Sequence, residues 1–327
     1  MVEATSLHEF CGTFGTAPVD IVVRSSFEGR SSVLARGLAG SCGVGKSLVF
    51  TSRRRSPLAE ANLREVRSAV RTAQVVELDR SDALATADAM RSNLGSFFAG
   101  LSRSQIIVDV STFPREELLV LLRLLCDLGP KARTTSLAYV GAKQMGDRLS
   151  GEVVQHRSVL GYAGDIHPSR KTKLVLLLGL ELARARSIID NYEPSKVVLG
   201  LPRLNDDTSG ELRDRLIRFR RELAASRPFG EPDFEFSVRD PVKTCREIVG
   251  AVGDAAGWNV VLAPLNTKLS TLGAGLYGLT HDWVQVCYAA VADYQERDYS
   301  QPNDKVFKVA MSSLLDAYPT EPGQASS

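Results

Sequence analysis

The feature that most constrains the fold of this chain is an alternation of short apolar segments, rich in β-branched residues, with longer segments of helical periodicity. The alternation starts near residue 18. This order predicts parallel strands joined by crossover helices, because parallel neighbours need a connection that crosses the sheet. With 327 residues the chain can bury two cores. We therefore expect an α/β protein with mainly parallel sheets.

The first half of the alternation extends to about residue 142. Its expected strands are Val19–Arg24, Ser47–Thr51, Gln74–Leu78, Gln105–Val110 and Thr134–Val140. Its expected helices are Arg30–Leu38, Leu58–Arg71, Asp82–Phe98 and Arg115–Leu128. Pro114 suits the first turn of the last helix, and Gly129-Pro130 suits its end.

The second half follows a break between Lys143 and Arg170, which contains several glycines and one expected strand, Val153–Leu160. Further strands are expected at Lys173–Leu178, Lys196–Leu199, Phe234–Val238, Asn259–Leu262 and Val284–Tyr288. Further helices are expected at Glu181–Tyr192, Glu211–Ser226, Val242–Val252, Lys268–Leu279 and Asp304–Asp316. The pattern predicts two tandem Rossmann-like units, with an N-terminal segment 1–17, domains 18–142 and 171–318, a connecting segment 143–170 and a disordered tail 319–327.

Composition excludes several kinds of protein. Lys and Arg total 40 against 38 Asp and Glu, a net charge of +2 that gives no strong attraction to nucleic acid. The five cysteines are scattered, without a Cys-x-x-Cys pair or metal-ligand spacing to a histidine, which predicts reduced thiols and no metal site. The N-terminus lacks a secretory signal, and no apolar run approaches the ~18–20 residues that cross a bilayer. We expect a cytoplasmic protein without a membrane partner, and the sequence identifies no cofactor.

The sharpest motif is Gly40-Ser41-Cys42-Gly43-Val44-Gly45-Lys46-Ser47, which fits the P-loop pattern Gly-x-x-x-x-Gly-Lys-Ser/Thr. A P-loop needs a strand before it and a helix after it, so that helix-terminal N–H groups and the lysine surround the phosphates. Here the expected order is inverted, with a helix before and a strand after. A glycine-rich helix-to-strand connection explains the same residues.

A stronger indication comes from topology, because ligands of open α/β sheets bind at the carboxyl ends of the strands. In the first half the polar residues expected at this edge follow the first and fourth strands: Arg24, Ser25, Ser26, Glu28, Arg30, Asp109, Ser111 and Thr112. Hydroxyls suit ribose or phosphate oxygens, and a guanidinium can bind phosphate with two hydrogen bonds. The alternative for Ser26 and Ser111 is that they only satisfy backbone donors.

In the second half the corresponding edge carries Gly179, Glu181, Arg184, Asn266, Thr267 and Lys268. A helix N-terminus with a lysine, followed by Gly273 and Gly275, favours an anion site. Tight packing of the helix through those glycines is the alternative. Both halves also place a Glu, with an Arg soon after, at the first strand-to-helix junction, which hints at duplication.

Catalytic residues are harder to identify. Glu28, Asp109 and Glu181 are candidate general acids, since a carboxyl group at the mouth of a sheet can have a perturbed pKa. The more ordinary role for Glu28 and Glu181 is an ion pair with the nearby arginine. His167 and His281 are not accompanied by a nucleophile turn of the Gly-x-Ser-x-Gly kind.

The layout of two Rossmann-like units with Ser, Thr and Lys loops at strand ends resembles the ligand-sensing domains of prokaryotic immunity, including the CRISPR-associated Rossmann fold. The run Ile107-Val108-Asp109-Val110-Ser111-Thr112-Phe113-Pro114, with Glu28 and Arg30, is also similar to bacterial proteins of antiviral defence loci. The resemblance implies sensing or partnering more than a particular reaction.

Four functions therefore remain open from the sequence. The first is a nucleotide-binding or phosphorylated-ligand-binding sensor or regulatory protein, with a protein partner or as a homodimer. The second is a hydrolase or glycosidase acting on a nucleotide or phosphosugar, the third a P-loop NTPase using Lys46 and Ser47, and the fourth an interaction scaffold without a small-molecule ligand.

Overall fold

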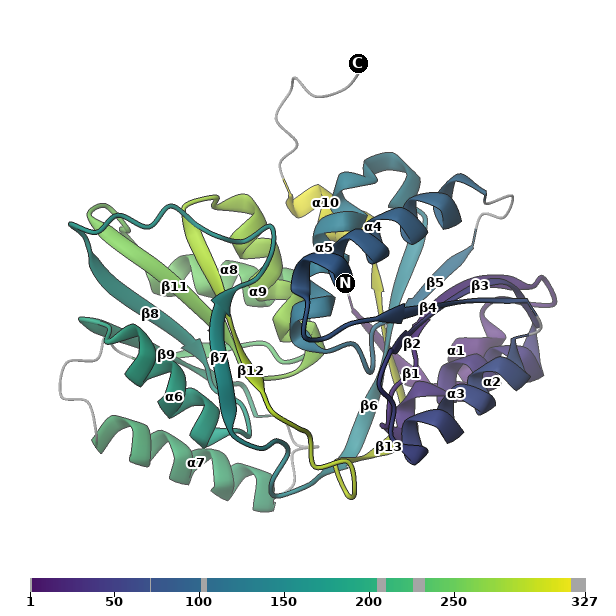
Figure 1. Ribbon diagram of the computed structural model, residues 1–327, viewed down its shortest axis with the longest axis horizontal. Coiled ribbons are helices and arrows are strands. Elements are labelled where there is room, and N and C mark those ends of the chain that lie inside the picture. The colour runs from purple at the N-terminus through teal and green to yellow at the C-terminus, as the bar shows by residue number, and fades with distance from the viewer. Residues whose placement is uncertain (1, 71, 101–104, 205–209, 226–232, 319–327) are drawn as a thin grey trace. The chain divides into compact units, whose positions relative to one another are not determined.

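The chain divides into two compact units (Figure 1). The computed structural model describes residues 2–70, 72–100, 105–204, 210–225 and 233–318. One unit comprises Met1–Gln155 with Ala290–Met311, and the other comprises His156–Ala289 with the segment from Ser312. Each unit contains a mainly parallel sheet with helices on both faces, so the predicted tandem Rossmann-like α/β fold is confirmed.

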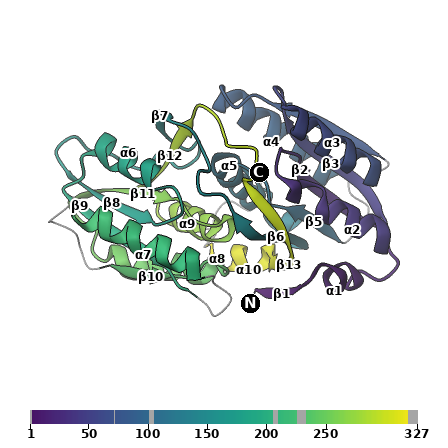
Figure 2. The ribbon, with the colours of Figure 1, turned by 90° about the horizontal axis from the view of Figure 1, so that it is seen from below.

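The sheet of the first unit has the strand order of a Rossmann-like fold. From one edge to the other it contains β1 (Glu3–Ser6), β13 (Ser300–Ala310), β6 (Thr135–Met145), β5 (Ile106–Asp109), β2 (Val19–Arg24), β3 (Val44–Ser52) and β4 (Ala73–Leu78). The strands from β6 to β4 are parallel, whereas β13 is antiparallel to both of its neighbours. β1 and β13 lie side by side (Figure 2). The chain winds outward from β2 in both directions, which places the topological switch point between β2 and β5.

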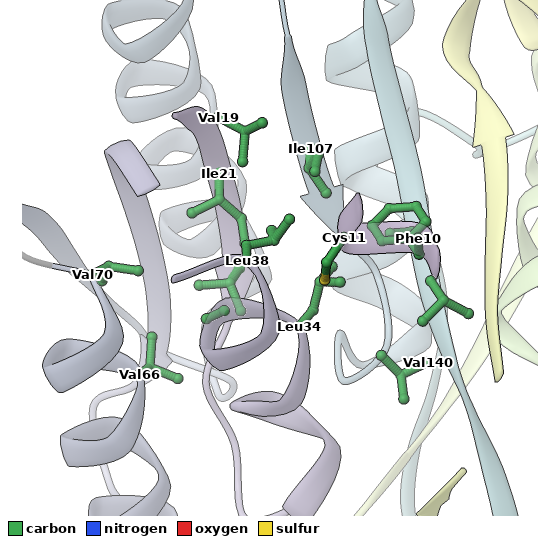
Figure 3. Packing of buried hydrophobic residues seen from close by; sticks show 14 of the residues in the cluster. Phe10, Cys11, Val19, Ile21, Leu34, Leu38, Val66, Val70, Ile107 and Val140 are labelled. Atoms are coloured by element: carbon green, nitrogen blue, oxygen red, sulfur yellow. The ribbon is translucent and has the colours of Figure 1, made fainter. Parts of the chain in front are cut away.

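Helices cover both faces of this sheet. α1 (Leu7–Gly12), α2 (Val33–Ser41) and α3 (Pro57–Ala69) lie on one face, and α4 (Ala83–Ala99) and α5 (Arg115–Asp127) lie on the other (Figure 1). Figure 3 shows Ile21 and Ile107 of the sheet facing Leu34 and Leu38 of α2. Every residue of β2 is buried, as expected for a central parallel strand, and each fully buried large apolar side chain contributes about 1.5–3 kcal/mol.

The second unit repeats this winding. Its sheet has the order β10 (Phe234–Phe236), β9 (Lys196–Pro202), β8 (Lys171–Leu177), β11 (Trp258–Pro264), β12 (Val284–Val291) and β7 (Val153–Ser158). The strands from β10 to β12 are parallel. α6 (Leu182–Tyr192) and α7 (Gly210–Ala225) cover one face, and α8 (Pro241–Val252) and α9 (Lys268–Thr280) cover the other (Figure 1). The second switch point therefore lies between β8 and β11.

The largest error of the sequence-based prediction concerns the helix expected at Asp304–Asp316. Residues Ser300–Ala310 form β13, and helix α10 covers only Met311–Ala317. The local pattern of Val306, Phe307 and Val309 fits a helix, but antiparallel pairing with β6 buries all three residues in the first unit. The pairing also moves this segment out of the second unit, where the predicted domain 171–318 had placed it.

Smaller differences lie at the ends of elements. The predicted N-terminal segment 1–17 contains β1 and α1, and the helix expected from Arg30 starts as a 3-10 turn at Gly29–Ser31 before α2. The chain first passes between the units after Gln155, inside the predicted connecting segment 143–170. The predicted tail 319–327 lies outside the described residues, as do residues 71 and 226 at the ends of two expected helices.

Candidate functional site

A continuous hydrogen-bonded network lies at the switch point of the first unit. Asp109 Oδ1, at the end of β5, accepts the Ser111 N–H at 2.9 Å and the Ser111 hydroxyl. Ser111 Oγ accepts the Val140 N–H at 2.8 Å, and Arg30 Nη1 donates to the Val140 carbonyl at 3.0 Å. Arg30 forms an ion pair with Glu28, whose Oε2 also accepts the Ser300 hydroxyl at 3.0 Å. We call Asp109, Ser111, Val140, Arg30, Glu28 and Ser300 the switch-point network.

Long-range pairing positions the members of this network. β13 runs antiparallel, so its first residue, Ser300, lies at the edge where the parallel strands end. Asn62 of α3 holds the loop after β2, because its Nδ2 donates to the carbonyls of Ser26 at 2.8 Å and Glu28 at 3.1 Å. The loop that carries Glu28 and Arg30 is therefore fixed from both sides.

Ser25 and Asp109 carry the polar atoms that the network does not use. Both residues are 1% exposed, and neither Ser25 Oγ nor Asp109 Oδ2 has a hydrogen-bond partner among the residues that the structure describes. Folded proteins pair nearly all such atoms, since leaving one unpaired costs about 1–3 kcal/mol. The Ser25 hydroxyl and one carboxyl oxygen of Asp109 are therefore buried polar groups at this switch point that the described protein atoms leave unsatisfied.

The strand register places these two side chains on the same face of the sheet. Val23 of β2 lies beside Asp109 of β5, and both Val23 and Ile107 belong to the core under α2. Side chains alternate between the faces of a strand, so Asp109 follows Ile107 and Ser25 follows Val23 onto the α2 face. The Ser25 N–H still pairs with the Phe50 carbonyl at 2.8 Å, so the extended backbone continues to this residue.

The environment of Asp109 perturbs its protonation. Burial raises the pKa of Asp109 to about 6, although the hydrogen bonds from Ser111 and the charge of Arg30 act in the opposite direction. The nearby Glu28 charge adds to the increase. Asp109 is therefore a carboxyl group that changes charge close to neutral pH, which suits an acid or base and a pH-sensitive ligand contact.

The other predicted residues of the first unit bind the protein itself. Arg24 forms a buried ion pair with Glu117 of α5, with Nε and Oε2 2.7 Å apart. Ser26 Oγ accepts the Glu28 N–H at 3.1 Å, and the Thr112 hydroxyl donates to the Arg24 carbonyl. The backbone-satisfying alternative is thus what the structure shows for Ser26, and Ser111 likewise binds the Val140 N–H.

The second switch point is closed by close backbone contact. A Cβ atom added to Gly179 would overlap the Leu265 carbonyl oxygen, so the loops after β8 and β11 touch there. Asn266 Nδ2 donates to the Leu178 carbonyl at 2.6 Å and ties the same two loops together. Only glycine fits this contact, which brings the backbones of the two loops together at the second switch point.

The predicted residues of the second unit do meet at this edge. Glu181 and Arg184 form a buried ion pair at 3.1 Å, which is the second unit's counterpart of Glu28 and Arg30. Thr267 donates to the Val238 carbonyl at 2.7 Å and caps α9, whose first residue, Lys268, is half-buried.

Helix α9 also favours the packing explanation of its glycines. A Cβ at Gly273 would lie 2.6 Å from the Pro241 carbonyl oxygen of α8. Most residues of α9 are buried, from Leu269 to Gly278. The glycine-rich sequence therefore permits close contact between α8 and α9, and the anion site predicted at its N-terminus gains no support from the glycines.

The P-loop-like motif lacks the structural context that a P-loop needs. Residues up to Ser41 end α2, and Val44 begins β3, so the order is helix, connection, strand. Lys46 Nζ donates to the Gly100 carbonyl, and Ser47 Oγ donates to the Thr72 carbonyl at 2.8 Å. The inverted order predicted from the sequence is confirmed, and the motif lacks the strand-loop-helix geometry through which a P-loop binds phosphate.

Sequence reasoning missed Ser300 and Asn62. Ser300 carries no local indication of its role, because its position depends on the pairing of β13 with β6. Asn62 could have been noticed, since it stands on the helix face formed by the buried Ala59, Leu63 and Val66. A polar residue in such an apolar stripe must bind a buried partner.

Metal-ligating side chains do not gather in the described part of the chain. Within the described ranges, no group of three or more His, Cys, Asp and Glu side chains could hold a metal ion. No described helix is both long and apolar enough to cross a bilayer. The five cysteines are buried, free thiols, as predicted.

Comparison with known proteins adds little to this geometry. No protein-family model and no curated protein matches the chain. Among solved structures, the crystal structure of the cytoplasmic domain of a prokaryotic cation chloride cotransporter aligns with 87% of this chain and 98% of that chain, at 10% identity and a TM-score of 0.24. A TM-score this low carries no argument about fold or function.

Proposed function

We propose that this protein is a cytoplasmic sensor or regulatory protein that binds a nucleotide or similar phosphorylated small molecule at the switch point of its first unit. The observation that carries the proposal is the pair of buried polar atoms, Ser25 Oγ and Asp109 Oδ2, left unused on adjacent strands among the described residues. Ligands of open α/β sheets bind at this position.

The chemistry of the two atoms favours a sugar or base rather than a phosphate as the deepest part of the ligand. A carboxylate oxygen accepts hydrogen bonds and repels a phosphate, whereas a serine hydroxyl can donate or accept. A ribose hydroxyl can donate to the carboxylate oxygen, and it can donate to or accept from the serine hydroxyl. The phosphate of the ligand would then lie further out, toward solvent.

The same arrangement supports a regulatory role. The loop between β2 and α2 carries both Ser25 and the Glu28–Arg30 ion pair. Arg30 donates a hydrogen bond to a backbone carbonyl of β6, and Glu28 accepts one from the first residue of β13. A ligand that displaces this loop would shift α2, which starts two residues after Ser31. In this proposal the output is a changed contact with a protein partner or a second copy of the chain, as in a bacterial defence system.

Thermal unfolding with a panel of nucleotides, nucleosides and phosphosugars tests the proposal. A ligand present at 100 times its dissociation constant stabilises the folded state by about 2.7 kcal/mol, which shifts the melting temperature visibly. We expect Ser25→Ala and Asp109→Asn to abolish this shift.

Two matched controls lie at the opposite edge of the same sheet. Thr135 of β6 is a buried hydroxyl that likewise has no partner in the described part of the chain, and Asp20 of β2 is a buried aspartate that accepts the Lys46 N–H at 2.6 Å. Thr135→Val and Asp20→Asn should retain the ligand shift. Retention of the shift in Ser25→Ala and Asp109→Asn as well would contradict the proposed site.

A second candidate is a hydrolase or glycosidase acting on a nucleotide or phosphosugar. The specific observation in its favour is the pKa of Asp109, raised by burial to about 6, which suits a general acid. Release of free base or of inorganic phosphate from the panel, lost in Asp109→Asn, would establish turnover. Binding without release of a product would support the sensor proposal and exclude the enzyme.

A further inference from the structure

An aromatic cluster lies beside the switch-point network. The Phe27 ring centroid is 5.8 Å from that of Tyr294 and 5.2 Å from that of Tyr299, and the two tyrosine rings are 5.9 Å apart. Tyr299 is buried, whereas Phe27 and Tyr294 are half-buried. The cluster therefore consists of one buried ring, Tyr299, and two rings, Phe27 and Tyr294, that are partly exposed.

Its position relative to the unused polar atoms follows from the sequence and from one contact. Phe27 is two residues beyond Ser25 in the same loop. Tyr299 precedes Ser300, whose hydroxyl binds Glu28, the residue after Phe27. Phe27 therefore lies in the loop that begins at Ser25, and the Ser300–Glu28 hydrogen bond holds the start of β13, with Tyr299, against the same loop.

A cation completes the cluster. Arg80 follows β4, which ends at the same edge of the sheet, and its guanidinium carbon lies 4.7 Å from the Tyr294 ring centroid. Arg80 is exposed. A guanidinium above an aromatic ring places a positive charge beside that ring, and positive charge attracts a phosphate.

We infer that the ligand is a nucleotide whose base stacks on Phe27 and Tyr294, whose ribose binds Ser25 and Asp109, and whose phosphate binds Arg80. This inference rests on the proposed function and adds the substrate class, because it requires a base. Aromatic side chains bind bases of any identity through their π faces. A phosphosugar without a base would lose this contact.

The orientations of the three rings favour stacking of a ligand on the cluster over a role in core packing alone. Tyr299 meets both other rings edge to face, at 84° to Phe27 and 78° to Tyr294, and so holds them in place from the buried side. Phe27 and Tyr294 are tilted by only 36° from one another. Unlike Tyr299, both of these rings keep part of their surface exposed.

Titration of the full chain with the four nucleoside 5′-monophosphates and with ribose 5-phosphate tests the inference. Wild-type protein should bind at least one nucleotide ten times or more tightly than ribose 5-phosphate. Phe27→Leu and Tyr294→Leu should each weaken nucleotide binding by about tenfold or more, with ribose 5-phosphate binding unchanged. Arg80→Gln should weaken binding of the nucleotide and leave that of the matching nucleoside unchanged.

The controls have the same chemistry elsewhere in the first unit. Phe14 also has a cation over its ring, with Lys308 Nζ 5.7 Å from the centroid, and Arg36 forms a surface ion pair with Glu65. Phe14→Leu and Arg36→Gln should bind nucleotides like wild type. Cooperative thermal unfolding of every variant verifies that it is folded.

The possible failures are distinguishable. If Tyr294→Leu and Phe27→Leu bind nucleotides normally, or ribose 5-phosphate binds as tightly as any nucleotide, the inference is overturned, while loss of binding in Ser25→Ala would still support the proposed function. If wild-type protein binds none of these compounds, both the inference and the nucleotide proposal are overturned.

Discussion

At the residue scale, buried carboxyl groups are used in two different ways at the switch points. Glu28 and Glu181 are each neutralised by an arginine close in sequence, whereas Asp109 has no ion pair of its own in the described structure. The cost of burying Asp109 appears as a pKa raised to about 6. Stability and ligand binding should both depend on this one group.

We predict that Asp109 makes the protein less stable as the pH rises from about 4 to 6. Its usual pKa is 3.8 and its folded pKa is about 6, so between these values the unfolded chain loses a proton that the folded chain keeps. This contribution to stability is complete below pH 3.8 and lost above about pH 6. Asp109→Asn removes the cost of burying the charged carboxylate and should stabilise the protein at pH 7 by up to about 3 kcal/mol.

Urea denaturation of wild type and Asp109→Asn across this pH range measures the effect. The difference between their free energies of unfolding should grow with pH and level off above pH 6. Asp20→Asn serves as the control, since Asp20 lies at the other end of the same sheet. A constant difference between wild type and Asp109→Asn would contradict the raised pKa.

Ligand binding should show the opposite dependence on pH. A ribose hydroxyl that donates to Asp109 Oδ2 favours the carboxylate, so nucleoside affinity should increase as the pH rises through about 6. A nucleoside is the better probe, because a phosphate monoester itself titrates near pH ~6. Calorimetric titration at several pH values measures this, and a flat profile for wild type would exclude Asp109 as the contact.

Gly179 offers a prediction about the second switch point. A methyl group added there would overlap the backbone carbonyl of Leu265, which is not the far end of a flexible side chain. Gly179→Ala should therefore destabilise the second unit by about 3 kcal/mol. Gly250 is the matched control, because it is exposed in α8 with nothing within 4 Å of an added Cβ. Gly250→Ala should gain roughly 0.5–1 kcal/mol by helix propensity, and similar melting temperatures for the two variants would contradict the close contact.

At the element scale, the central strands and their helices could be predicted because the residues that determine them lie within or next to each element. β2 is predicted to the residue, and α5 follows from Pro114 and Gly129 at its ends. β13 could not be predicted, because the sequence around Val306 and Phe307 fits a helix until β6 is present to pair with it. Long-range pairing, rather than propensity, decides such segments.

The site was predictable to the same extent. Ser25 and Asp109 could be predicted as candidate ligand-binding residues, because ligands of open α/β sheets bind at the carboxyl ends of the strands. That prediction needs only the positions of the strands. The distinction between Ser25 and Ser111 could not be foreseen, because it depends on the Val140 N–H of the neighbouring strand. Likewise, the closure of the second switch point depends on a contact between Gly179 and Leu265, which are far apart in sequence.

The connection between α2 and β3 gives a prediction at this scale. Lys46 binds the Gly100 carbonyl in a helix-to-strand segment and points to no phosphate site of the P-loop kind. Lys46→Ala should therefore leave the nucleotide-induced shift in melting temperature unchanged, with a stability change within about 0.5 kcal/mol. Ser25→Ala is the comparison that should lose the shift, and loss of the shift in Lys46→Ala would restore a role for the motif.

At the scale of the whole molecule, the segment His156–Ala289, which forms most of the second unit, is inserted in the first unit, and the segment from Ser312 joins the second unit after β13. The chain leaves the first unit after Gln155 and returns at Ala290, and the Ala292 N–H donates to the Glu152 carbonyl at 2.9 Å. The two ends of the insertion therefore lie side by side within the first unit. Insertions of this kind interrupt the sequence of a domain without interrupting its fold.

Excision of the insertion tests this description. A chain with residues 156–289 replaced by a short glycine-serine linker retains β13 and should unfold cooperatively, as followed by circular dichroism. Residues 1–155 alone lack β13, which pairs with both β1 and β6, and should not. Equal stability of the two chains would show that β13 is dispensable.

The return of β13 also sets the order in which the parts can fold during synthesis. β1 pairs with Lys305–Lys308, so this strand can pair only after residues about three hundred positions later have been made. At ~5–20 residues per second this interval is roughly 15 to 60 s. The segment His156–Ala289 of the second unit is synthesised before β13 emerges, and during that time β6 presents an unpaired edge. A nascent chain of this protein therefore exposes a strand edge of the kind that chaperones protect.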